Sequence, residues 1–154
     1  MEPVLPASYQ DLEVLRRRRA ELRESLSALE QALAGPAPGR VEAWTERVHV
    51  ALVELSADFR EHVETTEGPD GLYHGVLATA PRLSNAVATL TSEHVEIKRV
   101  IDDLLLCLTE PRVDDSVDAV RDLGTALLGR LVRHRQRGAD LVYEAYEADI
   151  GGET

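Results

Sequence analysis

The stretch LSNAVATLTSEHVEIKRVIDDLLLCL, residues 83–108, decides the fold. Its apolar residues recur at alternating spacings of three and four, which places them on one face of a long α-helix. One polar residue, His94, interrupts this stripe, and its imidazole should point into whatever core the stripe packs against. The full stripe comprises Leu83, Val87, Leu90, His94, Ile97, Ile101, Leu104 and Leu108.

Three other segments carry stripes of the same helical spacing, and a basic residue interrupts each one. The interruptions are Arg19, His62 and His134. Four long helices are therefore expected, over about residues 8–34, 41–67, 81–109 and 114–147. The three further stripes are Leu12, Leu15, Arg19, Leu22, Leu26, Leu29 and Leu33; Val48, Leu52, Leu55, Phe59, His62 and Thr66; and Val117, Val120, Leu123, Leu127, Leu131, His134, Gly138, Leu141 and Ala145.

Connections rich in glycine and proline separate the four segments, at residues 35–39 (GPAPG), 68–71 (GPDG) and 110–112 (EPR). An apolar piece, residues 72–77, is expected to resume a helical turn or two before Pro81 opens the third long helix. Short connections between long amphipathic helices predict one all-α domain over residues 1–154. Its predicted architecture is an up-down-up-down antiparallel four-helix bundle.

Composition excludes several classes of partner. The net charge is −11, from 28 acidic and 17 basic residues, which argues against binding to nucleic acid or to an anionic membrane. No segment approaches the roughly 18 consecutive apolar residues of a membrane span, and the start, Met1-Glu2-Pro3-Val4, lacks the pattern of a secretion signal. A soluble cytoplasmic protein is expected. The single cysteine, Cys107, excludes a disulfide framework.

Counting residues places the four basic side chains at one level of the expected bundle. Arg19 and His94 lie 11 and 13 residues from the starts of their helices, and His134 lies 13 residues before the end of its own. His62 reaches a similar level if residues 72–77 continue the second helix. At about 1.5 Å per residue, all four lie roughly 15–25 Å from one end of the bundle. Three imidazoles and one guanidinium are therefore expected in one layer.

Such a layer requires a compensating group. A lone histidine on an apolar stripe is usually a hydrogen-bonded core residue. Several buried basic groups are different, because their burial is costly unless a metal ion, an anion or carboxylates compensate. His49 lies beside its stripe and His74 lies in the irregular piece before Pro81, so both are expected outside the layer.

The order of these residues resembles the hemerythrin-like, or HHE cation-binding, domains. Members of that family are four-helix bundles whose core holds a non-haem di-iron site used for oxygen binding or sensing. The resemblance covers nearly the whole chain. It rests on FREHVETTE at residues 59–67, LY at 72–73, PRL at 81–83, EH at 93–94, His134, YEAY at 143–146 and DIGG at 149–152.

The family's ligand pattern is one His on the first helix, His-x-x-x-Glu on the second, His-x-x-x-His on the third and His-x-x-x-x-Asp on the fourth. Carried over to this chain, the pattern implies three metal ligands: His62, His94 and His134. The other four positions depart from it and hold Arg19, Thr66, Lys98 and Ala139.

Carboxylates are displaced from the positions where the family has them. Glu67 and Asp140 each stand one residue past the expected ligand, about 100° further round the helix. In the family both carboxylates bridge the two irons, and two cations a few ångströms apart repel strongly without bridging anions. Arg19 and Lys98 would add positive charge to the same pocket. A normal di-iron centre is therefore not expected.

Three interpretations follow, in order of preference. In the first, His62, His94 and His134 bind a single iron or zinc ion weakly or not at all, with Glu67, Asp140, Arg19 and Lys98 as accessory residues and a sensing role for the domain. In the second, the chain is a metal-free structural or signalling module in which Arg19 and Lys98 form ion pairs or bind a small anion. The third is oxygen or peroxide chemistry at non-haem iron, and an enzyme is the less favoured reading. A protein partner and a homo-oligomer are both left open.

Overall fold

Helices make up nearly all of the residues that the structure describes. The structure is a computed structural model that describes residues 9–110 and 116–148, and no strand occurs in those two ranges. The long helices are α1 (Tyr9–Ala34), α2 (Val41–Glu67), α4 (Ser84–Thr109) and α5 (Val117–Val142). Three short elements complete them: helix α3 (Leu72–Thr79), the 3₁₀ turn η1 (Pro81–Leu83) and the π-helix η2 (Tyr143–Ala148). The all-helical prediction is confirmed.

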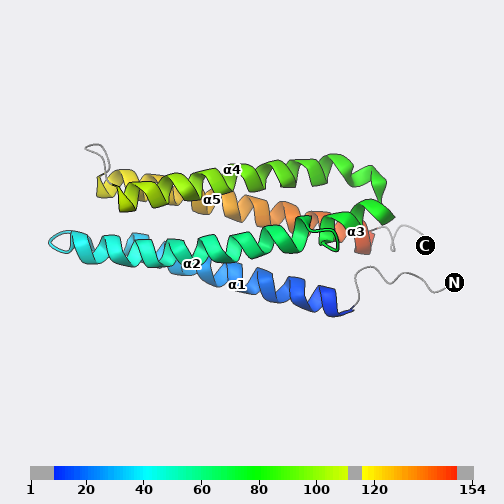
Figure 1. Ribbon diagram of the computed structural model, residues 1–154, viewed down its shortest axis with the longest axis horizontal. Helices are drawn as coiled ribbons and strands as arrows, with labels where there is room; N and C mark the ends of the chain where they lie inside the picture. Colours follow the sequence, from blue (N-terminus) through cyan, green and yellow to red (C-terminus); the bar gives the residue numbers. More distant parts are fainter. Residues whose placement is uncertain (1–8, 111–115, 149–154) are drawn as a thin grey trace.

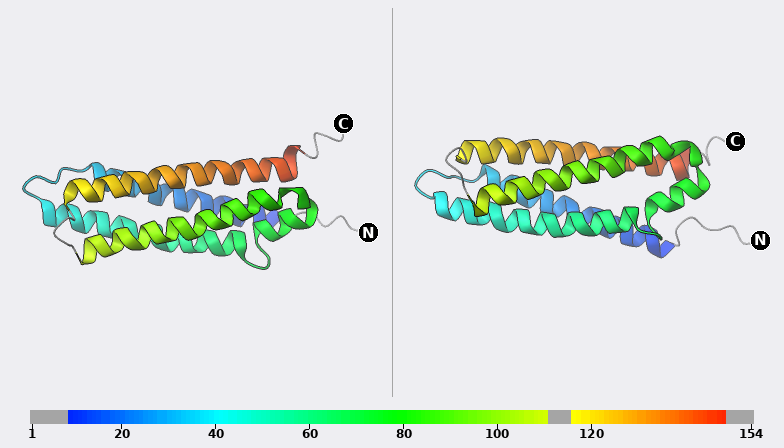
Figure 2. Two further views of the ribbon diagram at one scale, coloured as in Figure 1. Left: turned by 90° about the horizontal axis from the view of Figure 1, so that it is seen from above. Right: turned by 45° about the horizontal axis from the view of Figure 1, so that its top comes forward.

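The four long helices lie side by side as a bundle. In Figure 1, α1 and α4 run away from the end of the bundle where α3 lies, and α2 and α5 run back toward it. Helix α1 packs mainly on α2 and also on α5, while α4 packs on α5 and α2. The two further views in Figure 2 show the same side-by-side arrangement. No helix in the described ranges is long and apolar enough to cross a membrane.

Helix boundaries differ from the predicted ones in three places. The helix expected from Pro81 begins as the 3₁₀ turn η1 and becomes α-helical at Ser84. The last helix begins at Val117, where the Ser116 hydroxyl accepts a hydrogen bond from the Ala119 amide (3.1 Å). Its expected start at 114 lies outside the described residues. Near its end the helix widens into η2, where an ordinary α-helix was expected.

The piece after the second helix is a helix of its own. Helix α2 ends at Glu67, and the turn through Gly68 and Gly71 separates it from α3. A Cβ at Gly71 would lie 2.7–2.9 Å from the carbonyl oxygens of Thr66, Thr65 and Gly68, so the turn can close this tightly only with glycine. Residues 72–77 therefore resume helical structure, as expected. They do so in a separate helix, so the condition used to count the height of His62, a continuation of the second helix, is not met.

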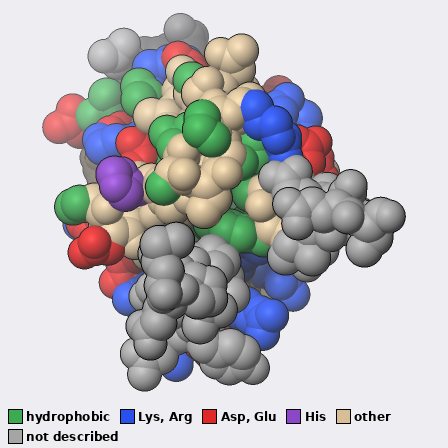
Figure 3. Space-filling model, turned by 90° about the vertical axis from the view of Figure 1, so that its right-hand side faces the viewer, with side chains coloured by type: hydrophobic (Ala, Val, Ile, Leu, Met, Phe, Trp, Pro, Cys, Tyr) green, Lys and Arg blue, Asp and Glu red, His purple; other side chains and the backbone are tan. Residues whose placement is uncertain are grey.

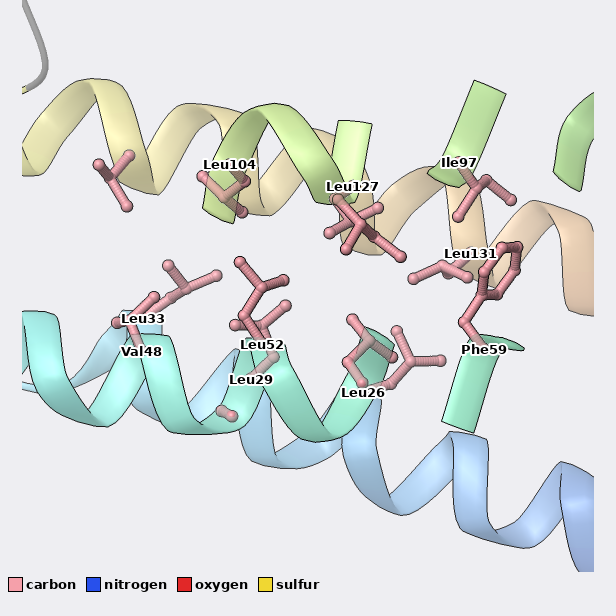
Figure 4. Packing of buried hydrophobic residues seen from close by; sticks show 14 of the residues in the cluster. Leu26, Leu29, Leu33, Val48, Leu52, Phe59, Ile97, Leu104, Leu127 and Leu131 are labelled. Carbon is pink, nitrogen blue, oxygen red and sulfur yellow. The ribbon is translucent and has the colours of Figure 1, made fainter. Parts of the chain in front are cut away.

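Two apolar clusters fill the bundle. The larger one lies toward the α1–α2 and α4–α5 connections. In Figure 4 its labelled residues, Phe59, Ile97 and Leu131 among them, project inward from the four long helices. The smaller one joins α3 to the neighbouring ends of α1, α4 and α5. Seen from the α3 end, hydrophobic side chains lie at the centre of the face, with charged side chains around them (Figure 3). The polar interruptions of the four stripes lie between the two clusters.

One residue that was predicted to be buried in the last helix, α5, is exposed. Leu123 was expected in the core, but its side chain is 40% exposed, and Gly124 is buried in its place. The Leu33 side chain occupies the space beside Gly124, where a Cβ would lie 2.5 Å from Leu33 Cδ1. Glycine therefore lets α1 and α5 approach closely, and this contact turns Leu123 outward.

Candidate metal centre

The structure brings His62, His94 and His134 together in one layer of the core. They come from α2, α4 and α5, and their side chains are 9%, 2% and 3% exposed. Their ring centroids lie 4.7–5.4 Å apart. The ring of Phe59 contacts all three imidazoles at centroid distances of 5.7–6.5 Å, so it closes the layer on the side of the larger apolar cluster. His49 and His74 lie outside this group.

The ring nitrogens lie close enough together that they could hold a metal ion. One nitrogen from each ring lies within 4.8 Å of those of the other two. His62 Nε2 and His134 Nε2 are 3.3 Å apart. Two ligands at typical zinc–nitrogen distances in a tetrahedral shell are separated by about 3.3 Å. This pair therefore already has the separation of two ligands of one small cation.

Carboxylates form hydrogen bonds with the Nδ1 atoms of two of the imidazoles. His94 Nδ1 donates to the Glu67 carboxylate, and His134 Nδ1 donates to Glu93 Oε1 over 2.9 Å. A proton on Nδ1 leaves the Nε2 lone pair free. Metal-binding histidines usually have such a carboxylate partner, which fixes the tautomer and orients the ring. In this tautomer the Nε2 lone pairs of His94 and His134 could bind a metal ion.

The third imidazole has one nitrogen without a partner. His62 Nδ1 is buried and forms no hydrogen bond within the described residues. Because His134 carries its proton on Nδ1, the 3.3 Å contact between the two Nε2 atoms requires His62 to donate from Nε2. A cation between these nitrogens would replace that proton.

Burial keeps the imidazoles uncharged at neutral pH. It lowers the pKa of His62 to about 3, with the charges of His94, His134 and Arg19 adding to the effect. Burial likewise lowers the pKa of His94 to about 3, with His134 contributing, and that of His134 to about 4. Only a neutral imidazole can bind a metal, so all three are in the required state.

Tyr73 and Arg19 lie beside the histidine layer, next to a small cavity. The Tyr73 hydroxyl is 3.4 Å from His94 Nε2, and the two rings stack at an interplanar angle of 16°. Burial raises the pKa of Tyr73, so its phenol is neutral without a cation beside it. Arg19 lines a cavity of about 20 Å³ together with His62, Thr66, Tyr73 and His134. That volume is enough for one water molecule.

Arg19 meets the expectation of a basic group at this level. Burial lowers the pKa of its guanidinium, and the nearby Tyr73 partly offsets that effect. Thr66, where the resemblance led us to look for a glutamate, donates its hydroxyl to the His62 carbonyl (2.8 Å). It therefore brings no anion into the layer.

Two expected accessory residues lie on the surface. Lys98 is 71% exposed and pairs with Asp102 (2.8 Å). Asp140 is exposed and accepts a hydrogen bond from Gln136 (2.9 Å). The resemblance implies both as accessory residues, because Lys98 stands at its second histidine position and Asp140 one residue past its aspartate position. The helix rotation that buries His94 and His134 turns Lys98 and Asp140 outward. The pocket therefore lacks the positive charge expected from Lys98.

Sequence reasoning missed Glu93, Tyr73 and Phe59 as site residues. Glu93 directly precedes His94, yet it serves the histidine of the neighbouring helix. The one sign of this role in the sequence is that the Glu93 carboxylate lies beside the apolar stripe of its helix, where that helix meets a neighbouring one. Glu67 was identified, but as a displaced ligand rather than as the hydrogen-bond partner of His94.

Comparisons with known proteins leave the site to be judged on its own geometry. No family model, curated protein or solved structure matches this chain.

Proposed function

We propose that this chain is a hemerythrin-like, up-down-up-down bundle that binds one divalent ion, zinc or ferrous iron, through His62, His94 and His134. The observation that carries the proposal is the geometry of the three rings: the 3.3 Å separation of two Nε2 atoms together with carboxylates on the Nδ1 atoms of two rings. Imidazole suits both metals. A sensing role is proposed for the domain.

Water or the Tyr73 phenolate completes the shell in this proposal. A three-histidine site with one open position is a common zinc arrangement. The cavity beside Arg19 accommodates a water at that position, and Tyr73 is within 3.4 Å of one ligand nitrogen. A second ion is not proposed, because no carboxylate is among the buried polar residues of the part of the chain that the structure describes.

Metal titration of protein made without a histidine tag tests the function. The protein is freed of metal with a chelator and then titrated separately with Zn²⁺ and, without oxygen, with Fe²⁺. Uptake should saturate at about one ion per chain, and at 100 times the dissociation constant the ion should add about 2.7 kcal/mol of stability. No uptake and no change in the unfolding temperature would refute the proposal.

Histidine variants locate the ion. His94→Ala should abolish uptake, because it removes one of three ligands. His49→Ala is the matched control, since His49 lies on α2 outside the layer, and it should bind as the wild type does. Equal loss in both variants would point to unspecific binding by surface histidines.

A metal-free interaction module is the second candidate. Its support is that Glu67 and Glu93 already pair with two of the imidazoles and that Arg19 stands where the family has a ligand. In that case His94→Ala changes only stability, and the wild type takes up neither metal.

A further inference from the structure

A long groove runs along the seam between α4 and α5, outside the histidine layer. Its volume is about 660 Å³, within the usual range of small-molecule sites. Three arginines of α5, spaced three and four residues apart, share one face of that helix and line the groove. From α4 come polar, small and acidic residues. The lining includes Asn85, Thr89, Ser92, Glu93, Glu96, Arg130, Arg133 and Arg137.

The acidic residues of the groove are already paired, whereas two of its arginines are not. Glu96 pairs with Arg99 (3.0 Å), and Glu93 pairs with Arg137 and His134. Arg130 and Arg133 have no acidic partner within 4.0 Å among residues 13–110 and 116–146. In a chain with a net charge of −11, this is a local excess of positive charge.

The other part of the groove is polar but uncharged. Because α4 and α5 run in opposite directions and Glu93 meets Arg137, Asn85 and Thr89 lie beyond Arg137 rather than opposite Arg130. The groove therefore has a cationic portion and a portion with amide and hydroxyl groups. A ligand with an anionic head and an uncharged polar body matches this division.

We propose that the groove binds a small phosphorylated compound, with its phosphate on Arg130 and Arg133. Guanidinium groups bind phosphate through paired N–H donors, which makes arginine the suitable residue for such a head group. Asn85, Thr89 and Ser92 then face the uncharged body.

The groove is also connected to the histidine layer. Glu93 contacts Arg137 through one carboxylate oxygen and His134 Nδ1 through the other. A phosphate that attracts Arg137 weakens its hold on Glu93 and changes the hydrogen bond that orients His134. Ligand binding in the groove thereby regulates the metal centre, a consequence that rests on the proposed function.

Titration of the metal-free chain with inorganic pyrophosphate at low salt tests binding, with the NMR signals of the arginine Nε–H groups as the readout. The signals of Arg130 and Arg133 should shift and saturate. Arg130→Gln/Arg133→Gln should bind at least tenfold more weakly. Arg16→Gln/Arg23→Gln, which removes the same charge from exposed sites on α1, should bind as the wild type does. Failure to saturate, or equal weakening in both double variants, overturns the proposal.

The nitrogen signals of the His134 ring test the connection in the same sample. They should move with saturation in the wild type and stay in place in Arg137→Gln. An unmoved His134 ring in the wild type overturns the regulatory link. Because no metal is present, neither result depends on whether the histidines bind one.

Discussion

Lowering the pH from 7 to 5.5 should destabilise the folded chain by about 4 kcal/mol, because three buried imidazoles stay neutral while those of the unfolded chain take up protons. Burial lowers the pKa of His62 and His94 to about 3 and that of His134 to about 4. Below the ordinary histidine pKa of about 6.5, the unfolded state binds more protons, so acid favours unfolding. Each group then contributes about 1.4 kcal/mol of destabilisation at pH 5.5.

The loss should roughly double, to about 8 kcal/mol, by pH 4.5. Most domains of this size have a total stability of about 5–15 kcal/mol, so cooperative acid unfolding is expected well above the pKa of the folded histidines. Glu67 acts in the opposite sense, because burial raises the pKa of its carboxyl and acid relieves that cost. This opposing contribution comes from one partly exposed carboxyl, whereas three buried imidazoles contribute to the destabilisation.

Urea unfolding followed by circular dichroism at pH 7, 6 and 5.5 measures the effect on metal-free protein. His134→Leu removes one of the three buried groups and should lower the pH dependence by about a third. A free energy of unfolding that stays constant between pH 7 and 5.5 would refute the reasoning. So would a His134→Leu variant with an unchanged pH dependence.

Three further predictions concern packing and the ligand positions that the hemerythrin resemblance implies. Leu104→Ala should lower the free energy of unfolding by about 2–5 kcal/mol, because Leu104 is fully buried and its loss leaves a cavity. Urea unfolding measures this, and a loss smaller than that of the exposed control Leu106→Ala would contradict the prediction. Gly124→Ala should lower the free energy of unfolding by about 1–3 kcal/mol, because the added Cβ would overlap the Leu33 side chain. Adding Leu33→Ala to the same chain should recover part of this loss. A Gly124→Ala variant that is more stable than the wild type would show that α1 and α5 are not in close contact. A variant with Arg19→His, Thr66→Glu, Lys98→His and Ala139→Asp should not acquire two irons per chain, because positions 98 and 139 face the solvent; elemental analysis that finds two would contradict the exposure of Lys98 and Ala139.

Periodicity was enough to predict the long helices and their buried faces. Residue counts along straight helices give the height of His94 and His134, whereas the count for His62 assumed that residues 72–77 continue the second helix, which they do not. Neither quantity gives the rotation of one helix against the next. Lys98 lies only about 40° round the helix from His94, yet its side chain is exposed. The contact between neighbouring helices is narrow, so a small rotation separates a buried position from an exposed one.

Hydrogen-bond partners on neighbouring helices could not be predicted either, because the sequence pattern does not give the rotation of one helix against the next. Glu67 reaches His94 and Glu93 reaches His134 because of how α2, α4 and α5 pack, and no spacing within one helix encodes those pairs. Leu123 and Gly124 show a related limit. Leucine has the stronger preference for the core, but the close approach of Leu33 admits only the residue without a side chain.

The polar layer between the two apolar clusters also determines how the helices are aligned along the bundle axis. Leucines in successive layers are nearly interchangeable, so an all-apolar core would tolerate one helix sliding past its neighbours by a turn, about 5.4 Å. Here such a slide would carry His94 or His134 into the apolar residues above or below and part it from its glutamate. Buried polar residues select one register in coiled coils in this way. The same histidines that would hold an ion therefore exclude shifted packings of this bundle before any ion is bound.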